Sequence, residues 1–251
     1  MLLPHWLRRR ASHIADSAAI PEGVRAYVIG DIHGRADLLE DIARRIEIDS
    51  RGAPAEVVTI FLGDYIDRGP RSAEVVDRLQ RGAFPTAIVT LKGNHEQTMI
   101  DAFADPNTLG AWRQFGGLET LVSYGVDVSQ VMRGLQFEDA SRRLAEKTPT
   151  EHRQFLESLP LKYELDGYFF CHAGVRPGVP LSAQSAAELL WIREEFLQSS
   201  AFHGKIVVHG HTPVSAPEVR PNRINIDTGA YATGVLTALV LEGTARRFLS
   251  T

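Results

Sequence analysis

The chain has 251 residues, of which 44% are hydrophobic, and this is enough to bury the core of one large domain. With 27 basic and 31 acidic residues, its formal net charge of −4 gives no broad basic surface for nucleic acid and no support for binding to a membrane surface. The single cysteine, Cys171, excludes an internal disulfide framework and fits a reducing compartment, so we expect a cytoplasmic protein.

The first 23 residues have a short apolar start followed by the arginines Arg8, Arg9 and Arg10. A secretory signal has its charges first and a longer apolar run after them, so this order does not predict one. No stretch approaches the roughly 18 to 20 apolar residues of a membrane-spanning helix. We therefore expect a soluble protein with an N-terminal arm over residues 1–23 and a single domain over residues 24–251.

Apolar runs of strand length recur along the chain, at residues 27–29, 57–62, 87–91, 168–171, 206–208, 224–226 and 235–241. Helical patterns separate the early runs: Leu38, Leu39, Ile42 and Ile46 share one face, and Val75, Val76 and Leu79 follow Ser72, a candidate N-cap. Alternation of strand and helix predicts an α/β fold with a largely parallel, covered sheet. Ligands in such sheets collect beyond the carboxyl ends of the strands.

Residues 97–160 have a helical and polar pattern, which we interpret as an inserted helical cap. Its apolar positions are Trp112, Phe115, Leu118, Leu121, Val122, Val131, Leu135, Leu144, Phe155, Leu156 and Leu159. Substrate selection and plain structural cover are equally good explanations of such a segment. Near the end, residues 236–241 and 247–249 flank Glu242 and Gly243 as a predicted hairpin.

Six short glycine-bearing strings carry most of the chemistry. They are GDIHG (30–34), GDYIDRG (63–69), GNHE (93–96), CHAG (171–174), HGHTP (209–213) and IDTG (226–229). Each alone is usually a turn, and a lone histidine is commonly structural. However, five of the nine histidines lie in these strings, close to predicted strand ends, and independent accidents do not explain that.

These strings predict a site for two divalent cations. Asp31 and His33 are two residues apart after a strand, so if the backbone stays extended their side chains point the same way and can hold one ion. Asp64 follows the next strand and can bridge two ions about 3.5 to 4 Å apart. The expected ligands of the first ion are Asp31, His33 and Asp64, and those of the second are Asp64, Asn94, His172 and His211.

A ligand set of oxygen and nitrogen without thiolate disfavours a structural zinc site and suits Mn²⁺, with Fe and Zn²⁺ as alternatives. Two divalent ions against the charges of Asp31 and Asp64 leave a positive surplus for a phosphoryl group. Arg68 and Arg193 can add bidentate phosphate contacts, although surface ion pairs explain them equally well.

GDIHG, GDYIDRG and GNHE in this order, with the later CHAG and GHTP, resemble the phosphoprotein phosphatase branch of the calcineurin-like metallophosphoesterases. Trp191-Ile192-Arg193 and residues 226–230 also resemble its bacterial and phage members, such as lambda protein phosphatase. The resemblance covers residues 27–241. It implies a β-sandwich of mixed sheets flanked by helices, with a helical cap insertion.

The resemblance also implies roles for individual residues. It implies metal binding by the ligands named above and phosphate binding by Arg68 and Arg193. It implies that His95 is the general acid that protonates the leaving oxygen, with Asp67 orienting it, while a metal-bridging hydroxide attacks phosphorus in line. The implied activity is a serine/threonine protein phosphatase, with phosphotyrosine as a further substrate.

Three other functions are compatible with parts of the sequence; one stays open and two are disfavoured. A symmetrical diadenosine tetraphosphatase shares GDIHG-like and GNH strings but typically carries another residue at the position of Asp67, so nucleoside polyphosphates remain possible substrates. A catalytically silent metal-binding module is disfavoured because Asp67, His95, Arg68 and Arg193 are all present. A cysteine-nucleophile phosphatase is disfavoured because Cys171 and Arg176 have four residues between them rather than five. We expect structural roles for Cys171, His209, Asp227 and Tyr231.

Overall fold

The computed structural model describes residues 18–251. Most of the expected N-terminal arm, residues 1–17, lies outside this range. Ala18 and Ile20 are buried, and the backbone N–H of Ile20 donates to the Gly243 carbonyl at 3.0 Å. None of the helices in the described range is long and apolar enough to cross a bilayer.

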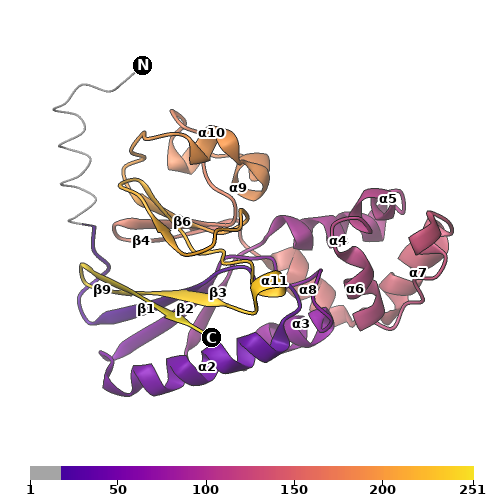
Figure 1. Ribbon diagram of the computed structural model, residues 1–251, viewed down its shortest axis with the longest axis horizontal. Helices are drawn as coiled ribbons and strands as arrows, with labels where there is room; N and C mark the ends of the chain where they lie inside the picture. The colour runs from indigo at the N-terminus through magenta and orange to yellow at the C-terminus, as the bar shows by residue number, and fades with distance from the viewer. Residues whose placement is uncertain (1–17) are drawn as a thin grey trace.

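Two five-stranded mixed sheets pack face to face (Figure 1). The first sheet has the order β10-β9-β1-β2-β3, with β1 (Val24–Ile29), β2 (Glu56–Phe61), β3 (Ala87–Thr90), β9 (Thr237–Glu242) and β10 (Ala245–Ser250). The second sheet has the order β4-β5-β6-β8-β7, with β4 (Lys162–Leu165), β5 (Tyr168–Cys171), β6 (Ile206–His209), β7 (Glu218–Val219) and β8 (Arg223–Asn225). The expected sandwich of mixed sheets is confirmed.

The pairing follows the sequence pattern closely in the first sheet. Strand β1 pairs in parallel with β2, and β2 pairs in parallel with β3, as the strand–helix alternation predicts. The expected hairpin is the antiparallel pair β9 and β10, although β10 is longer than predicted. Strands β4 and β7 are not predicted from the sequence, because KYEL and EV are short and half polar and lie at the two edges of their sheet.

Alternating side chains of the strands enter different cores. From β1, Val28 packs between the two sheets against residues such as Phe170 and Val208, whereas Tyr27 and Ile29 face the helices on the other side. In the second sheet, Tyr168 and Phe170 face inward and Phe169 faces outward. This period of two is the geometry of a strand covered on both faces.

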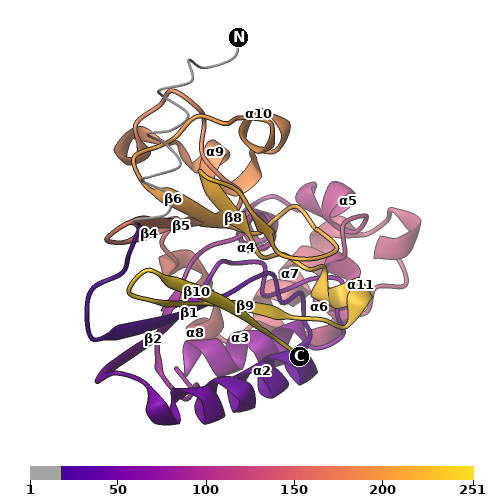
Figure 2. The same cartoon turned by 60° about the vertical axis from the view of Figure 1, so that its left-hand side comes forward.

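Helices cover the outer face of each sheet (Figures 1 and 2). Helices α2 (Ala36–Asp49) and α3 (Ser72–Gln80) pack on the first sheet, and α9 (Ala186–Trp191) and α10 (Glu194–Leu197) pack on the second. The predicted face of α2 is confirmed, because Leu39, Ile42 and Ile46 are fully buried and Leu38 is partly buried against the same core. The prediction of Ser72 as an N-cap is wrong: it is the first residue of α3, the N-cap is Arg71, and the Ser72 hydroxyl accepts the N–H of Asp67 at 3.0 Å instead.

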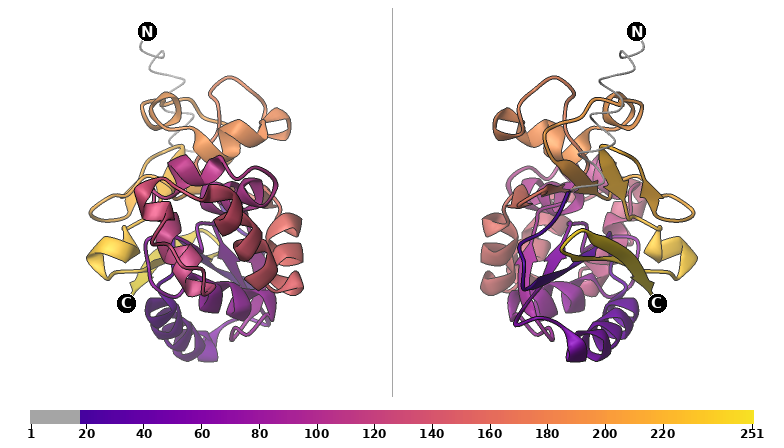
Figure 3. Two further views of the ribbon diagram at one scale, coloured as in Figure 1. Left: turned by 90° about the vertical axis from the view of Figure 1, so that its right-hand side faces the viewer. Right: turned by 90° about the vertical axis from the view of Figure 1, so that its left-hand side faces the viewer.

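The chain between β3 and β4 is helical and lies at one end of the sandwich (Figure 3, left). It contains α4 (Asn94–Ala104), α5 (Thr108–Trp112), α6 (Gly117–Ser123), α7 (Phe137–Lys147) and α8 (Thr150–Ser158). Trp112, Leu121, Leu144 and Leu156 are buried there, whereas Phe115, Val122 and Leu135 are exposed. The short helix α11 (Ala230–Thr233) follows β8.

Helix α2 offers a matched test of this packing. Ile42 is fully buried, whereas Ile48 on the same helix is 63% exposed. We expect Ile42→Ala to lower the free energy of unfolding by about 2–5 kcal/mol, because it removes buried methyl groups and leaves a cavity. Ile48→Ala should change it by less than about 1 kcal/mol. Urea unfolding followed by circular dichroism, with a chelator present, measures both, and equal losses would contradict the assigned face.

Candidate active site

The candidate ligands meet at one edge of the sandwich, where the strings that follow β1, β2, β3, β5 and β6 come together. Two buried groups of side chains share Asp64: His33, Asp64 and His95 form one, and Asp64, His172 and His211 form the other. In each group, one nitrogen or oxygen atom per residue lies within 4.8 Å of the others. Asn94 joins the second group through His172. The structure therefore gathers four of the expected ligands, together with His95, around the carboxylate of a fifth, Asp64.

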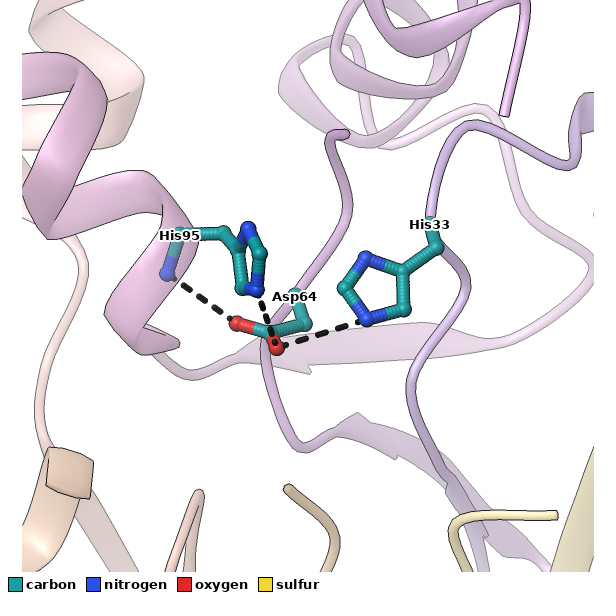
Figure 4. Close-up of side chains that lie close together, drawn as sticks. All are labelled: His33, Asp64 and His95. Atoms are coloured by element: carbon teal, nitrogen blue, oxygen red, sulfur yellow. Dashed lines mark hydrogen bonds and ion pairs between the residues drawn. The ribbon is translucent and has the colours of Figure 1, made fainter. Parts of the chain in front are cut away.

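Asp64 is central because both of its carboxylate oxygens face imidazole nitrogens. Its Oδ2 lies 3.6 Å from His33 Nε2 and 3.7 Å from His95 Nε2 (Figure 4). Its Oδ1 lies 3.3 Å from His172 Nε2. The Nε2 of His172 is also 2.8 Å from Asn94 Oδ1 and 3.1 Å from His211 Nδ1. These distances fit the expected bridging position of Asp64.

The tautomers of His33 and His172 provide a test of whether cations fit here. The Nδ1 of His33 lies 2.8 Å from the Ile66 carbonyl, and the Nδ1 of His172 lies 3.1 Å from the Leu62 carbonyl. A carbonyl oxygen only accepts, so each Nδ1 carries the proton and, in a neutral ring, each Nε2 offers a lone pair to Asp64. A lone pair on Nε2 repels the lone pairs of the carboxylate or amide oxygen that it faces, unless a cation lies between the two atoms. The donor set therefore fits a centre for two metal ions.

Burial keeps these rings neutral. It lowers the pKa of His33 to about 3 and that of His211 to about 2, and it also lowers the pKa of His172. Burial alone would raise the pKa of Asp64, but the surrounding imidazoles, of which His95 is the charged one, lower the pKa of this carboxyl. A neutral imidazole and an ionised carboxylate are the forms that bind metal.

Asp31 lies beside this cluster rather than inside it. Its carboxylate accepts the backbone N–H of His211 at 3.0 Å, and burial, Asp227 and Asp64 raise its pKa well above the usual range. Burial also raises the pKa of Asp227 to about 6. A Cβ at Gly210 would clash with Asp31 Oδ1, so only glycine at 210 leaves room for the carboxylate. Positive charge beside Asp31 would favour its ionised form.

His95 differs from the other histidines in charge. Its Nδ1 lies 2.5 Å from Asp67 Oδ2, which also accepts Trp112 Nε1 at 2.6 Å, and Asp67 Oδ1 accepts the Thr120 hydroxyl at 2.5 Å. Burial alone would lower the pKa of His95, but Asp64 and the hydrogen bond to Asp67 raise it to about 9. The protonated ring then has a second N–H, at Nε2, to donate.

Two arginines lie at the mouth of the site. Arg68 Nη2 is 3.4 Å from His95 Nε2, and its guanidinium lies over the ring of Tyr231, 4.5 Å from the ring centre. Arg193 is exposed, and its Nη1 donates to the hydroxyl of Thr212 at 3.0 Å. A pocket of about 380 Å³ has both arginines, His95 and the exposed rings of Phe115 and Trp191 in its wall. An anion between Arg68 and a protonated His95 would accept hydrogen bonds from both.

Backbone strain is concentrated in the same residues. Of the seven non-glycine residues with positive φ in the described chain, five are His33, Asp64, Asp67, Arg68 and His211. Such conformations cost about 1–3 kcal/mol each and persist only where neighbours hold them. Here Asp67 N–H donates to Thr120 Oγ1 at 2.9 Å, and Arg68 N–H donates to the Gly116 carbonyl at 3.0 Å. The strain therefore marks the candidate site independently of its chemistry.

Some contributors to the site are not predicted from the sequence. Glu96, Trp112 and Thr120 hold its loops, and Tyr231, expected to be structural, packs under Arg68. Glu96 has half of a capping-box signal: it lies three residues after the N-cap Gly93 and accepts its N–H at 2.8 Å, but glycine has no side chain to complete the box.

Two side chains of the strings lie apart from the cluster. His209 has its Nδ1 3.1 Å from the Gly210 carbonyl and packs against Phe196. Cys171 is fully buried in the core beneath α9 and α10, and burial raises the pKa of its thiol. Its burial agrees with a packing role.

Most of the chain is similar to known proteins. Residues 24–234 match the family model of the calcineurin-like phosphoesterases. The asymmetrical bis(5′-nucleosyl)-tetraphosphatase PrpE of Anoxybacillus flavithermus is 26% identical over 234 residues, which are 84% of this chain and 88% of that protein.

Two solved structures share the fold. A putative diadenosine tetraphosphatase has a TM-score of 0.62 at 20% identity, covering 92% of this chain and 98% of the other. A protein serine/threonine phosphatase from Saccharomyces cerevisiae has a TM-score of 0.57 at 17% identity, covering 99% and 90%. With its family model matched over most of its length and its histidine and aspartate clusters suited to two metal ions, the chain belongs to the calcineurin-like phosphoesterases.

Proposed function

We propose that this protein hydrolyses phosphoesters with two divalent metal ions, and that Mn²⁺ is the metal it uses. Asp31, His33 and Asp64 would hold one ion, and Asp64, Asn94, His172 and His211 the other. When bound, the ions supply Lewis-acid stabilisation of phosphoryl oxygens and activate water. The lone pairs of His33 and His172 that face Asp64 support this ligand set.

We propose His95 as the general acid, and the observation that carries the function is its pairing with Asp67. The contact of 2.5 Å between His95 Nδ1 and Asp67 Oδ2 fixes the ring and favours its protonated form. Its Nε2–H then faces Arg68 at the mouth, where a leaving oxygen would take the proton. Arg68 and Arg193 bind the phosphoryl oxygens and orient them.

For the substrate, we propose nucleoside polyphosphates of the dinucleoside tetraphosphate type. The support is the set of relatives named as bis(5′-nucleosyl)-tetraphosphatases, one of which is 26% identical over 84% of this chain. A cationic pocket with Arg68, His95 and Arg193 in its wall suits a multiply charged anion. A phosphoserine or phosphothreonine protein is the second candidate, because the GDYIDRG string with Asp67 resembles protein phosphatases.

His95→Asn tests whether His95 is an acid or a ligand, since it lies in one cluster with His33 and Asp64. We expect turnover to fall about 10²–10⁴-fold because the proton donor is lost. Metal content, measured by plasma mass spectrometry, should remain near two ions per chain. Loss of one ion would instead make His95 a ligand.

Asp67→Asn tests the partner of His95. Asp67 is among the groups that raise the pKa of His95 to about 9, so without its charge this pKa falls. An acid acts only while it is protonated, so activity is lost as pH rises through its pKa. We therefore expect the alkaline limb of the kcat–pH profile to move to lower pH in Asp67→Asn. A lower kcat at every pH, with the alkaline limb at its wild-type position, would contradict the assignment of Asp67 as the residue that tunes His95.

Substrate comparison tests the function as a whole. With Mn²⁺ at saturation, we expect kcat/KM on diadenosine tetraphosphate to exceed that on phosphoserine, phosphothreonine and phosphotyrosine peptides. The reverse order would favour the second candidate. A protein with full metal occupancy that hydrolyses none of these substrates, nor para-nitrophenyl phosphate, would be a catalytically silent metal-binding module, and this result would contradict the proposed function.

A further inference from the structure

Two large aromatic side chains remain exposed in the wall of the active-site pocket. Phe115, between α5 and α6, is 61% exposed, and Trp191, at the end of α9, is 50% exposed. Exposed aromatic rings forgo the stabilisation that their burial would bring. Both come from elements far apart in sequence, yet both line the pocket that contains Arg68, His95 and Arg193.

Each ring is tied to one of the two arginines. The carbonyl of Gly116, next to Phe115, accepts the backbone N–H of Arg68 at 3.0 Å. Gly116 has a φ of 103°, and a Cβ there would lie 2.5 Å from Arg68 Cγ, so the turn fits tightly only with glycine. Trp191 lies two residues before Arg193 and packs edge-on against His211 at 6.5 Å between ring centres. The backbone therefore places both rings relative to the groups that would bind phosphate.

The charge in the pocket is of one sign. Its charged side chains are Arg68 and Arg193, and no carboxylate belongs to its described wall. A ligand that fits is therefore anionic where it meets the two arginines and flat and aromatic where it meets Phe115 and Trp191. A nucleobase has two π faces on which aromatic side chains stack, whereas a phosphoserine or phosphothreonine side chain has none.

We propose that Phe115 and Trp191 form a binding site for the base of a nucleoside polyphosphate whose phosphates lie at Arg68, His95 and Arg193. The inference rests on the proposed function, because it takes the phosphoryl end of the ligand to be held at His95. It assigns the selection of nucleotides to these two rings. The phosphate-binding residues alone would accept any phosphoester.

The test compares two probes that differ only in the nucleoside: α,β-methylene-ADP, which resists cleavage between its phosphorus atoms, and methylenediphosphonate. Calorimetry on the full-length protein loaded with Mn²⁺ gives both dissociation constants. We expect the nucleotide to bind at least about tenfold more tightly than methylenediphosphonate. Phe115→Ala and Trp191→Ala should each reduce this ratio severalfold and leave the affinity for methylenediphosphonate unchanged.

Two variants serve as controls. Phe248→Ala makes the same chemical change at a partly exposed phenylalanine of β10, outside the pocket, and should keep the wild-type ratio. Phe115→Tyr keeps an aromatic ring at position 115 and should also keep the wild-type ratio. A wild-type ratio near one, or a ratio that Phe115→Ala and Trp191→Ala leave unchanged, overturns the inference.

The proposed function is judged separately, from hydrolysis of diadenosine tetraphosphate. A protein that does not hydrolyse it, yet shows a nucleotide preference that both alanine variants reduce, overturns the proposed substrate and supports the base-binding site. A protein that hydrolyses it with a ratio near one supports the function and overturns the site.

Discussion

The candidate site depends on one buried carboxylate, that of Glu96, which holds the loop after β2 in place. It accepts the backbone N–H groups of Gly93, Asp64 and Tyr65, each at 2.8 Å. Asp64 needs such support because its φ of 54° costs about 1–3 kcal/mol. Burial raises the pKa of Glu96 to about 7, so the carboxylate is itself held at a cost that these N–H groups offset. Because Asp64 belongs to both side-chain clusters, its position sets the geometry of each.

The histidines around Asp64 occur in two forms, neutral and protonated. His33 and His172 donate their Nδ1 protons to carbonyls and are neutral, with Nε2 toward Asp64. His95 has Asp67 at its Nδ1 instead of a carbonyl, and its pKa is raised to about 9. Neutral rings bind metal and a charged ring donates a proton, so the partner of each Nδ1 separates the two roles.

The sequence predicts what depends on local order. Strand ends followed by Asp31, His33, Asp64 and Asn94 are recognisable because an apolar run and the polar residue after it are adjacent in the chain. Strands β4 and β7 escape prediction because an edge strand has little apolar pattern. The contacts of Asp67 with Trp112 and Thr120, 45 and 53 residues away, have no signal in local spacing. Neither has the packing of Tyr231 under Arg68, because the fold alone brings these segments together.

The helical segment between β3 and β4 has two candidate roles, selection of substrate and plain cover of the core, and its polar contacts favour the first. Trp112 and Thr120 donate to Asp67, and Gly116 accepts the N–H of Arg68. The same turn carries Phe115 into the pocket wall. A segment that only covered the core would need none of these polar contacts, since buried apolar side chains such as Leu121 and Leu144 suffice for packing. The groups that orient His95, the proposed proton donor, and Phe115 of the proposed base-binding site therefore belong to one structural unit, so a substitution that shifts this turn would affect both.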